Sequence, residues 1–197
     1  FDIHGGGLDL TFPHHECEIA QSVAVFGDGS FAKYWMHNGF INVDNEKMSK
    51  SLGNFFTLKD IFVKYDPKVV RFMFLQTHYR NPINFSDALL DQAKAGLARI
   101  HDFVRSVESF RLLEVESDLD IESEVQSFID KAAQDFESAM DNDLDTSGGL
   151  AAFFDLLKAV NILTTENKLS VKSVEAILEF LKKLDAVFGV ILVQQED

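Results

Sequence analysis

The sequence predicts an α/β region followed by an all-α region. Residues 1 to about 60 hold most of the glycines and read as a strand, a glycine turn, a helix and a second strand, an order typical of α/β domains. From Thr57 onward, apolar residues recur every three or four positions, as they do in amphipathic helices. The change of period predicts that the chemistry-bearing residues lie in the first part and a helical bundle in the second.

In the α/β region, Phe1–His4 is expected to close a strand that runs into a turn at Gly5-Gly6-Gly7. Pro13 is expected to open a helix that continues to about Val25, because proline is favoured at the first helical position. Tyr34–Val43 then reads as a strand that leads into a lysine- and serine-rich loop.

The all-α region should begin with short helices on either side of Pro67 and continue, after an irregular Thr77–Phe85, with a longer helix from Ser86. Glu114–Asp120 is acidic and poor in apolar residues, which predicts a linker. The final part should be a bundle. Its expected helices are Glu122–Met140, Thr146–Leu163 and Val171–Val193.

Composition narrows the class of protein. The chain has 197 residues, 46% of them hydrophobic, which is enough for a proper core. Its net charge of −14 argues against broad adhesion to nucleic acid or anionic membranes, while leaving room for a local basic face. A single cysteine excludes an internal disulfide and fits a reducing cytosol, and no run of about 18 apolar residues is present to span a bilayer. Phe1 is not an initiator methionine, so we expect a piece of a longer protein.

The first candidate site is a metal half-site. His14 and Glu18 are four residues apart on the predicted helix and should share one face, which Cys17 borders. Imidazole and carboxylate are common zinc ligands, but a tetrahedral site needs further ligands from elsewhere. The alternative is a polar helix start, where His15, Glu16 and Glu18 lie near the positive end of the helix dipole without any metal.

The second candidate site combines Gly5-Gly6-Gly7 with Asp9. Glycines let a ligand approach the backbone, and a carboxylate can accept hydrogen bonds from both hydroxyls of a ribose. The same glycines could form only a flexible turn, and they do not match a G-x-G-x-x-G fingerprint. His37 could face a nucleotide, or could be a packed and hydrogen-bonded core histidine.

The third candidate site is the loop Asp44–Asn54, which presents Lys47 and Lys50 together with two serines. Lysine ammonium groups on flexible stems and serine hydroxyls suit a polyphosphate ligand. On composition alone, a solvated turn explains the loop equally well. It is not a Walker loop.

The string Lys47-Met48-Ser49-Lys50-Ser51 resembles the KMSKS signature of class I aminoacyl-tRNA synthetases. With Phe1–Ser22 and Tyr34–Gly39 it resembles, more narrowly, the cysteinyl-tRNA synthetase family. The resemblance continues through His78–Arg80 into Phe136–Thr146, which looks like the helical tRNA-contacting domain of that family, and so covers essentially the whole chain.

This resemblance implies a zinc ion bound by two cysteines, a histidine and a glutamate, which takes the thiolate of the substrate cysteine. His14 and Glu18 match the histidine and the glutamate. The cysteine ligands belong to segments upstream of Phe1 in the family, so Cys17 is not expected to be one of them. The soft metal would explain the rejection of serine.

The resemblance also implies that Lys50 contacts the phosphates of ATP, which is used with Mg²⁺, and that Lys47 assists it. Asp9 with Gly5 and Gly7 matches the ribose site, and His37 lies near the nucleotide. Charge placement and positioning would then do most of the catalysis.

We therefore expect the C-terminal portion of a cysteine–tRNA ligase that uses L-cysteine, ATP and tRNA(Cys), with a cytoplasmic, monomeric parent. The expected domains are the end of a Rossmann-like catalytic domain (1–58), a helical stem-contact region (59–113) and a tRNA-binding helical bundle (114–197). The HIGH motif of the family is not found in these residues, so the chain alone should be inactive. The alternatives are a non-catalytic tRNA-binding or helical interaction module and a cysteine ligase that acts on an amino sugar.

Overall fold

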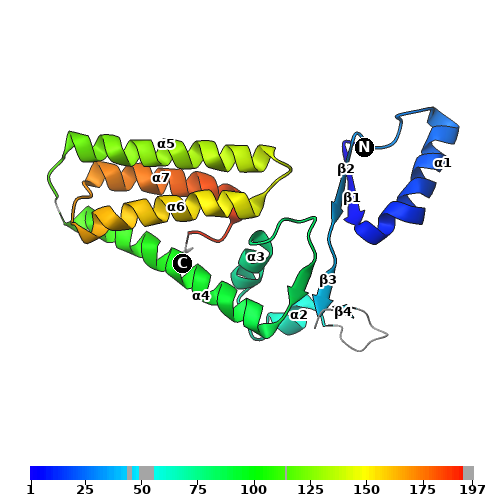
Figure 1. The fold of residues 1–197 in the computed structure, drawn as a ribbon, viewed down its shortest axis with the longest axis horizontal. Coiled ribbons are helices and arrows are strands. Elements are labelled where there is room, and N and C mark those ends of the chain that lie inside the picture. The colour runs from blue at the N-terminus through cyan, green and yellow to red at the C-terminus, as the bar shows by residue number, and fades with distance from the viewer. Residues whose placement is uncertain (44–45, 49–55, 114, 193–197) are drawn as a thin grey trace. The chain divides into compact units, whose positions relative to one another are not determined.

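The computed structural model describes residues 1–43, 46–48, 56–113 and 115–192 (Figure 1). The chain forms two compact units, which are described separately below. The first unit comprises Phe1–Thr57 and Tyr79–Ser86, and the second comprises Leu58–His78 and Asp87–Asp197.

The described residues of the first unit form two small sheets and one α-helix. In the first sheet, β1 and β2 pair in parallel, and in the second, β3 pairs antiparallel with β4 and parallel with β5. The elements are β1 (Ile3–Gly7), α1 (Glu16–Phe26), β2 (Tyr34–Asn38), β3 (Ile41–Val43), β4 (Glu46–Lys47) and β5 (Ile83–Phe85).

The predicted glycine turn is wrong, because Gly5-Gly6-Gly7 lies inside β1 and pairs with Met36, His37 and Asn38. A side chain is not tolerated easily here, since a Cβ at Gly5 would lie 3.1 Å from the carbonyl oxygen of Met36. The predicted helix start is also corrected. Phe12 has an extended backbone and α1 begins only at Glu16, after an irregular helical turn at Thr11–His15.

The single strand predicted for Tyr34–Val43 is divided at Gly39 into β2 and β3, which belong to different sheets. Gly39 is buried against the backbone of Asn81, whose carbonyl carbon would lie 2.4 Å from an added Cβ. Its N–H donates to the carbonyl oxygen of Tyr79 at 2.8 Å. The segment Thr77–Phe85, predicted to be irregular, therefore returns to β3 and contributes β5.

In the second unit, the described residues form helices and the connections between them. Figure 1 shows α5, α6 and α7 side by side, with α4 running along them. The helices are α2 (Leu58–Ile61), α3 (Pro67–Leu75), α4 (Asp87–Ser109), α5 (Leu119–Asp141), α6 (Thr146–Thr165) and α7 (Val171–Phe188).

Side-chain caps set most of these helix starts. Asp66 accepts a hydrogen bond from the N–H of Lys68 at 2.6 Å, with Pro67 in the first helical turn, as predicted for α3. Asp118 caps α5, which explains why this helix begins at Leu119 inside the predicted linker rather than at Glu122. Asp145 and Ser170 cap α6 and α7.

Polar side chains join α3 and α4 to the end of α7. Arg71 donates to the carbonyl oxygens of Val187 and Phe188, the former at 3.0 Å. Lys68 Nζ donates to the carbonyl oxygen of Leu192 at 3.2 Å, and His101 Nε2 lies 3.0 Å from the carbonyl oxygen of Val190. The contacts of Arg71 satisfy carbonyls that the end of α7 leaves without intrahelical partners, and those of Lys68 and His101 hold the segment that follows the helix.

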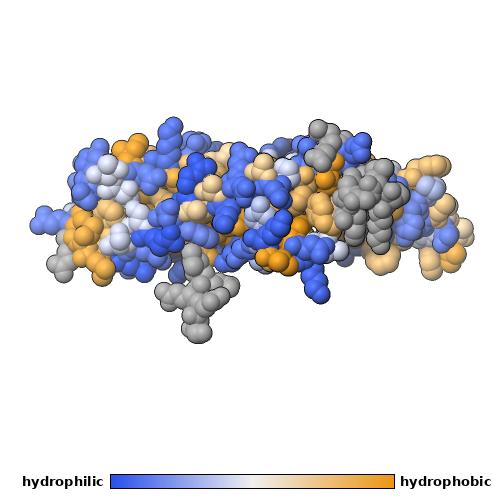
Figure 2. Space-filling model, turned by 90° about the horizontal axis from the view of Figure 1, so that it is seen from below, coloured by the Kyte–Doolittle hydropathy of each residue, from blue (hydrophilic) through white to orange (hydrophobic). Residues whose placement is uncertain are grey.

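The helix α6 packs against α5 and α4 in the bundle. The sequence predicts no segment that could span a membrane, yet within the described ranges α6 is long and apolar enough to do so by length and composition. Its burial explains this character, because the packed face of a core helix is also apolar. The buried residues are Gly149, Leu150, Ala152, Phe153, Leu156, Val160 and Leu163. Hydrophilic residues cover much of the bundle face seen in Figure 2.

Candidate active site

One face of the β1–β2 pair gathers aromatic and imidazole side chains. His4 is in register with Trp35, and Gly6 is in register with His37. Because alternate residues of a strand point to the same face, His4, Trp35 and His37 share one side of the pair. The rings confirm this, since His4 and Trp35 have centroids 5.0 Å apart and Trp35 stacks with His37 at 6.1 Å.

His15 covers this face from the turn that precedes α1. It is only 3% exposed, and its Nδ1 lies 2.9 Å from Nε2 of His37. The ring centroids of His15 and His4 are 4.8 Å apart. Gly6 makes this approach possible, because a Cβ there would lie 3.2 Å from Cε1 of His15 and 2.7 Å from Cδ1 of Leu10.

Glu18 extends this cluster from the first turn of α1. Its Oε2 lies 2.9 Å from Nε2 of His4, and its Oε1 lies 3.6 Å from Nε2 of His14. The spacing of four residues does place His14 and Glu18 on one face, as the sequence predicts. His14 is largely exposed, whereas Glu18 is half-buried and lies between the two histidines.

The environment of His15 favours its neutral form. Burial lowers the pKa of His15, the neighbouring His4 and His37 lower it further, and the opposing influence of Glu18 is weaker. A neutral imidazole has one N–H donor and one acceptor nitrogen. In the contact between Nδ1 of His15 and Nε2 of His37, one of the two nitrogens donates its proton and the other accepts it.

The cluster offers ligands that suit a metal ion. The ligand atoms of His4, His15 and Glu18 all lie within 4.8 Å of one another. Two imidazole nitrogens and a carboxylate oxygen are donors that zinc accepts, and a tetrahedral centre would take one more. Cys17 is exposed and stands outside this group.

Sequence reasoning selected His14 and Glu18 and missed His4 and His15. The helical spacing of four residues identified the first pair, whereas the other two residues meet through strand pairing and a turn. The sequence did offer one signal for this grouping. His4 and Gly6 are two residues apart, so in a strand they share one face, and Gly6 pairs with His37. The choice of His14 as a metal ligand stays a prediction.

The predicted ribose site lies at the end of β1. Asp9 is exposed and occupies a short 3-10 turn at Leu8–Leu10. Its carboxylate fills the space beside Gly7, where a Cβ would lie 2.5 Å from Oδ1 of Asp9. The absence of a side chain at Gly7 therefore leaves room for the carboxylate of Asp9. Binding of ribose by Asp9, Gly5 and Gly7 stays a prediction.

The predicted phosphate site is described only in part. The backbone of Lys47 pairs with Asn42 at the end of β4, and the N–H of Met48 donates to the carbonyl oxygen of Ile41 at 3.1 Å. The side chain of Lys47 and the whole of Lys50 lie outside the described residues. Their proposed roles towards ATP are therefore untested predictions.

Two families match different parts of the chain. Residues 1–95 match the tRNA synthetases class I (C) catalytic domain, and residues 135–193 match the DALR domain. The first match includes both sheets and the histidine cluster. The second covers α6, α7 and the end of α5.

Curated relatives match the chain along its length. The cysteine–tRNA ligase of Shouchella clausii is 50% identical over 196 residues, which are 100% of this chain and 41% of the relative. The cysteine–tRNA ligase of Clostridioides difficile is 48% identical over 191 residues, which are 96% of this chain and 41% of the relative. The chain thus spans about two fifths of the length of these proteins.

A solved structure shares the fold. The agnB2 LeuRS of Agrobacterium radiobacter K84, crystallised as a ternary complex with tRNA and LeuAMS, matches with a TM-score of 0.71. The match covers 95% of this chain and 27% of that protein, at 18% sequence identity. At this identity the match establishes a shared fold alone.

Proposed function

We propose that this chain, which belongs to the cysteinyl-tRNA synthetase family, forms part of a cysteine–tRNA ligase. The observation that supports this most strongly is the 50% identity to a named cysteine–tRNA ligase across the whole chain. The convergence of His4, His14 and His15 on Glu18 supports the same function, because it offers a site for a thiol-binding metal.

The proposed reaction has two steps. A carboxylate oxygen of L-cysteine attacks the α-phosphorus of ATP, so a new oxygen–phosphorus bond forms, the α–β phosphoanhydride bond breaks and pyrophosphate leaves. A ribose hydroxyl of the terminal adenosine of tRNA(Cys) then attacks the carbonyl carbon of cysteinyl-adenylate, and AMP leaves. Both steps depend on placing reactants and on stabilising charge, not on a covalent bond to the protein.

In the proposed site, Glu18 and His14 hold a zinc ion, with His15 as a further candidate and with His4 either as a ligand or as the hydrogen-bond partner of Glu18. When bound there, zinc would supply a soft partner that distinguishes a thiolate from a hydroxyl. The residues of this chain fit such a group, because Glu18 faces imidazole nitrogens on two sides, at 2.9 Å and 3.6 Å. His4 orients the carboxylate by its hydrogen bond, in the way that partners of metal ligands do.

The neighbouring residues would position the substrates. Buried, neutral His15 holds the ring of His37 by a hydrogen bond and so fixes the nucleotide-facing side of β2. Asp9 would accept hydrogen bonds from the ribose hydroxyls. Lys50, assisted by Lys47, would neutralise the phosphates of ATP, which carries Mg²⁺, and the departing pyrophosphate.

The helical unit would contact tRNA(Cys), since residues 135–193 match the DALR domain. We place the protein in the cytoplasm, where ATP, L-cysteine and tRNA are found together, and we expect a monomer. A non-catalytic tRNA-binding module would not need the cluster around Glu18, and an amino-sugar ligase would not need the helical unit.

The test is amino-acid-dependent ATP–pyrophosphate exchange by the full-length protein, with cysteine and serine compared at equal concentrations. Exchange that depends on cysteine supports the ligase. The 197-residue chain alone should show no exchange. If the full-length protein shows no exchange with cysteine but binds tRNA, it is a binding module, and transfer of cysteine to an amino sugar would establish the other alternative.

A second comparison assigns the histidine ligand. His14→Ala should lower both bound zinc and cysteine-dependent exchange, the exchange by on the order of 10–100-fold, as loss of a metal-site residue typically does. His4→Ala should produce the larger loss if His4 is a ligand and His14 only a neighbour. Equal zinc content in both variants and the wild type would exclude His4 and His14 as zinc ligands.

A further inference from the structure

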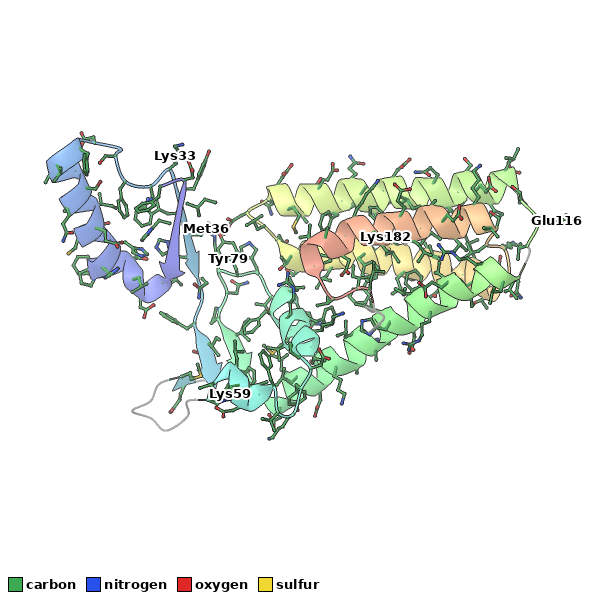
Figure 3. All side chains as sticks on the ribbon, turned by 180° about the vertical axis from the view of Figure 1, so that it is seen from behind. Lys33, Met36, Lys59, Tyr79, Glu116 and Lys182 are labelled. Carbon is green, nitrogen blue, oxygen red and sulfur yellow. The ribbon has the colours of Figure 1, made fainter. Side chains whose placement is uncertain are left out.

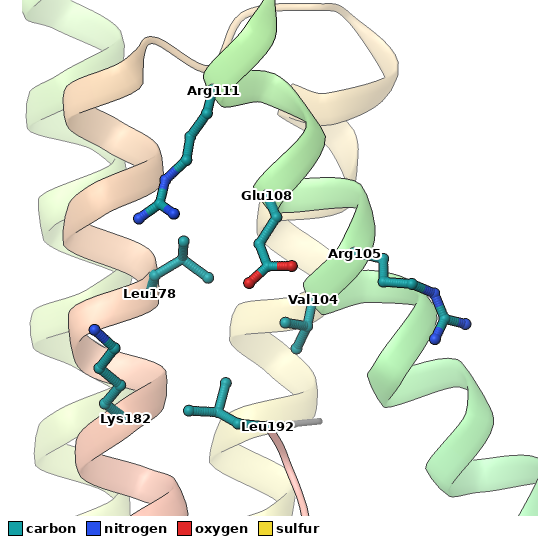
Figure 4. A pocket seen from close by; sticks show the side chains of 7 residues that line it. All are labelled: Val104, Arg105, Glu108, Arg111, Leu178, Lys182 and Leu192. Atoms are coloured by element: carbon teal, nitrogen blue, oxygen red, sulfur yellow. The ribbon is translucent and has the colours of Figure 1, made fainter. Parts of the chain in front are cut away.

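A hollow of about 480 Å³ lies in the helical unit, away from the histidine cluster in the sequence. It opens between the end of α4, the face of α7 and the segment that follows α7 (Figure 4). Its lining combines two kinds of side chain, three apolar and four charged. They are Val104, Leu178 and Leu192, and Arg105, Glu108, Arg111 and Lys182.

The apolar side chains form the inner surface of this hollow. Val104 is 3% exposed and Leu178 is 5% exposed, while Leu192 is half-buried. Val104 and Leu178 come from different helices, so the surface depends on the packing of α4 against α7 and does not belong to a single helix. In such pockets, apolar walls contact the apolar body of a small molecule, and a few polar side chains fix its orientation.

Two of the cations at the hollow have no partner within the described part of the chain. Arg105 forms an ion pair with Asp102 and points away from the hollow in Figure 4. Arg111 and Lys182, by contrast, take part in no ion pair there, and their head groups lie on the α7 side of the hollow with Leu178 between them. The adjacent Lys183 is satisfied by Glu179, 3.4 Å away on its own helix.

The charge at the hollow differs from that of the whole chain, which carries 32 acidic and 18 basic residues. Glu108 is the one carboxylate among the side chains of the hollow, yet no ion pair joins it to Arg111 or Lys182 in the described structure. The hollow therefore keeps an excess of positive charge beside an apolar surface.

We propose that this hollow is a binding site for a small organic anion, a molecule with an apolar body that carries a phosphate or carboxylate. The anionic group contacts the guanidinium of Arg111 and the ammonium of Lys182, which bind such oxygens through charge-assisted hydrogen bonds. The apolar body lies against Val104 and Leu178. Glu108 accepts from a hydroxyl or amino group, so it disfavours a ligand with negative charge at both ends.

A nucleic-acid backbone fits these observations less well. Binding to a phosphate backbone uses cations spread along a surface, because each phosphate is followed by another. Here two free cations converge on one concave site whose inner surface is apolar. The argument for this site uses no part of cysteine activation, so its test does not depend on the proposed enzymatic function.

The test is an NMR titration of the ¹⁵N-labelled 197-residue chain with phenyl phosphate, inorganic phosphate and phenol. Phenyl phosphate combines a ring with a dianion, and the other two probes separate these parts. We expect phenyl phosphate to shift the amide signals of Val104, Arg111, Leu178 and Lys182, and to bind at least about tenfold more tightly than either part, since each contact adds free energy of this order.

Charge-neutral variants locate the site. Arg111→Gln with Lys182→Gln should weaken phenyl phosphate binding by about tenfold or more, because both charged hydrogen bonds are lost. Lys183→Gln is the matched control and should bind as the wild type does, since Lys183 is paired with Glu179. All of these side chains are exposed, so the far-UV circular dichroism should not change.

Three results would overturn the proposal. The first is the absence of saturable shifts at these residues, or shifts that the double variant leaves unchanged. The second is equal binding of inorganic phosphate, which would reduce the hollow to a simple charge site. The third is displacement of phenyl phosphate by an unrelated RNA in a strongly salt-dependent manner, which would assign the surface to nucleic acid.

Discussion

The two compact units bury different kinds of side chain. Among the described residues of the first unit, Phe85 is the one buried apolar side chain, and it is joined by buried His15 and Gly39. In the described part of the helical unit, each of the helices α3 to α7 contributes buried apolar residues to the core. The first unit is thus organised by ring contacts and hydrogen bonds, and the second by hydrophobic packing.

The candidate active site thus lies in the unit that has little apolar burial, and the hydrophobic core lies in the other unit. The helix α1 buries none of its residues, and Val25 and Phe26 are 72% and 77% exposed. Figure 3 shows the side chains of both units, including Lys33, which pairs with Asp2 at 2.7 Å beside β1. A unit with so little apolar burial gains little stability from it. We therefore expect the first unit to unfold more easily than the helical unit.

The largest effect should come from the helical core. Phe153→Ala should lower the free energy of unfolding of the helical unit by about 3–5 kcal/mol, because it removes a buried ring and leaves a cavity. Phe153 is 1% exposed and contacts Phe103 edge-on at 6.3 Å. Urea unfolding followed by far-UV circular dichroism measures the change.

Phe26→Ala provides the matched control in the first unit. Phe26 is 77% exposed, so the same truncation should change stability by less than about 0.5 kcal/mol. Equal losses for the two variants would contradict the contrast between the units.

The next effect should be confined to the first unit. Gly39→Ala should destabilise this unit by about 1–3 kcal/mol, because the new Cβ would overlap the backbone of Asn81. Trp35, the single tryptophan, lies in β2 and reports on this unit by fluorescence. The tryptophan transition should move to lower urea while the circular dichroism transition stays in place, and movement of both together would show that the units unfold as one.

The smallest effect should appear as a pH dependence in the helical unit. Lys172 donates to Glu122 at 2.7 Å, and Ser117 and Ser170 donate to the same carboxylate. These hydrogen bonds, that of Lys172 first, lower the pKa of Glu122 from 4.5 to about 2. A lowered pKa in the folded state stabilises the protein above the ordinary pKa, and this contribution is lost as the pH falls from about 4.5 towards 2.

Glu122→Gln removes that titration. The stability difference between wild type and variant should be constant near neutral pH and shrink as the pH falls through this range. The measurement is urea unfolding at a series of pH values, and a difference that does not change with pH would contradict the assigned partners. Added salt should reduce the difference, because Lys172 is exposed.

The helices could be predicted from the sequence because their signals are local. Pro67, the apolar stripe of α7 and the acidic or serine caps all act within a few residues of the helix they define. The strands could not be divided correctly. The break at Gly39 and the strand β5 depend on contacts between residues 39–43 and 79–85, which no local pattern contains.

The same distinction applies to the candidate site. The pair of His14 and Glu18 could be predicted from the sequence because helical spacing places them together, even though α1 begins later than predicted. His4, His15 and His37 were not grouped, since parallel pairing of β1 with β2 and the turn before α1 bring them together. The ring contacts among these histidines and the neighbouring aromatic residues also depend on the pairing of β1 with β2.

Cysteine–serine discrimination tests the account most directly. The measurement is the ratio of kcat/KM for cysteine to kcat/KM for serine in ATP–pyrophosphate exchange by the full-length protein. It is made for the wild type, for Glu18→Gln and for the control Glu175→Gln, which lies on the exposed face of α7. We predict that Glu18→Gln lowers kcat/KM for cysteine by on the order of 10–100-fold and loses most of the preference for cysteine over serine. The control should keep both the rate and the preference. Undiminished discrimination in Glu18→Gln would contradict the account, because selection of the substrate thiol would then lie outside this cluster.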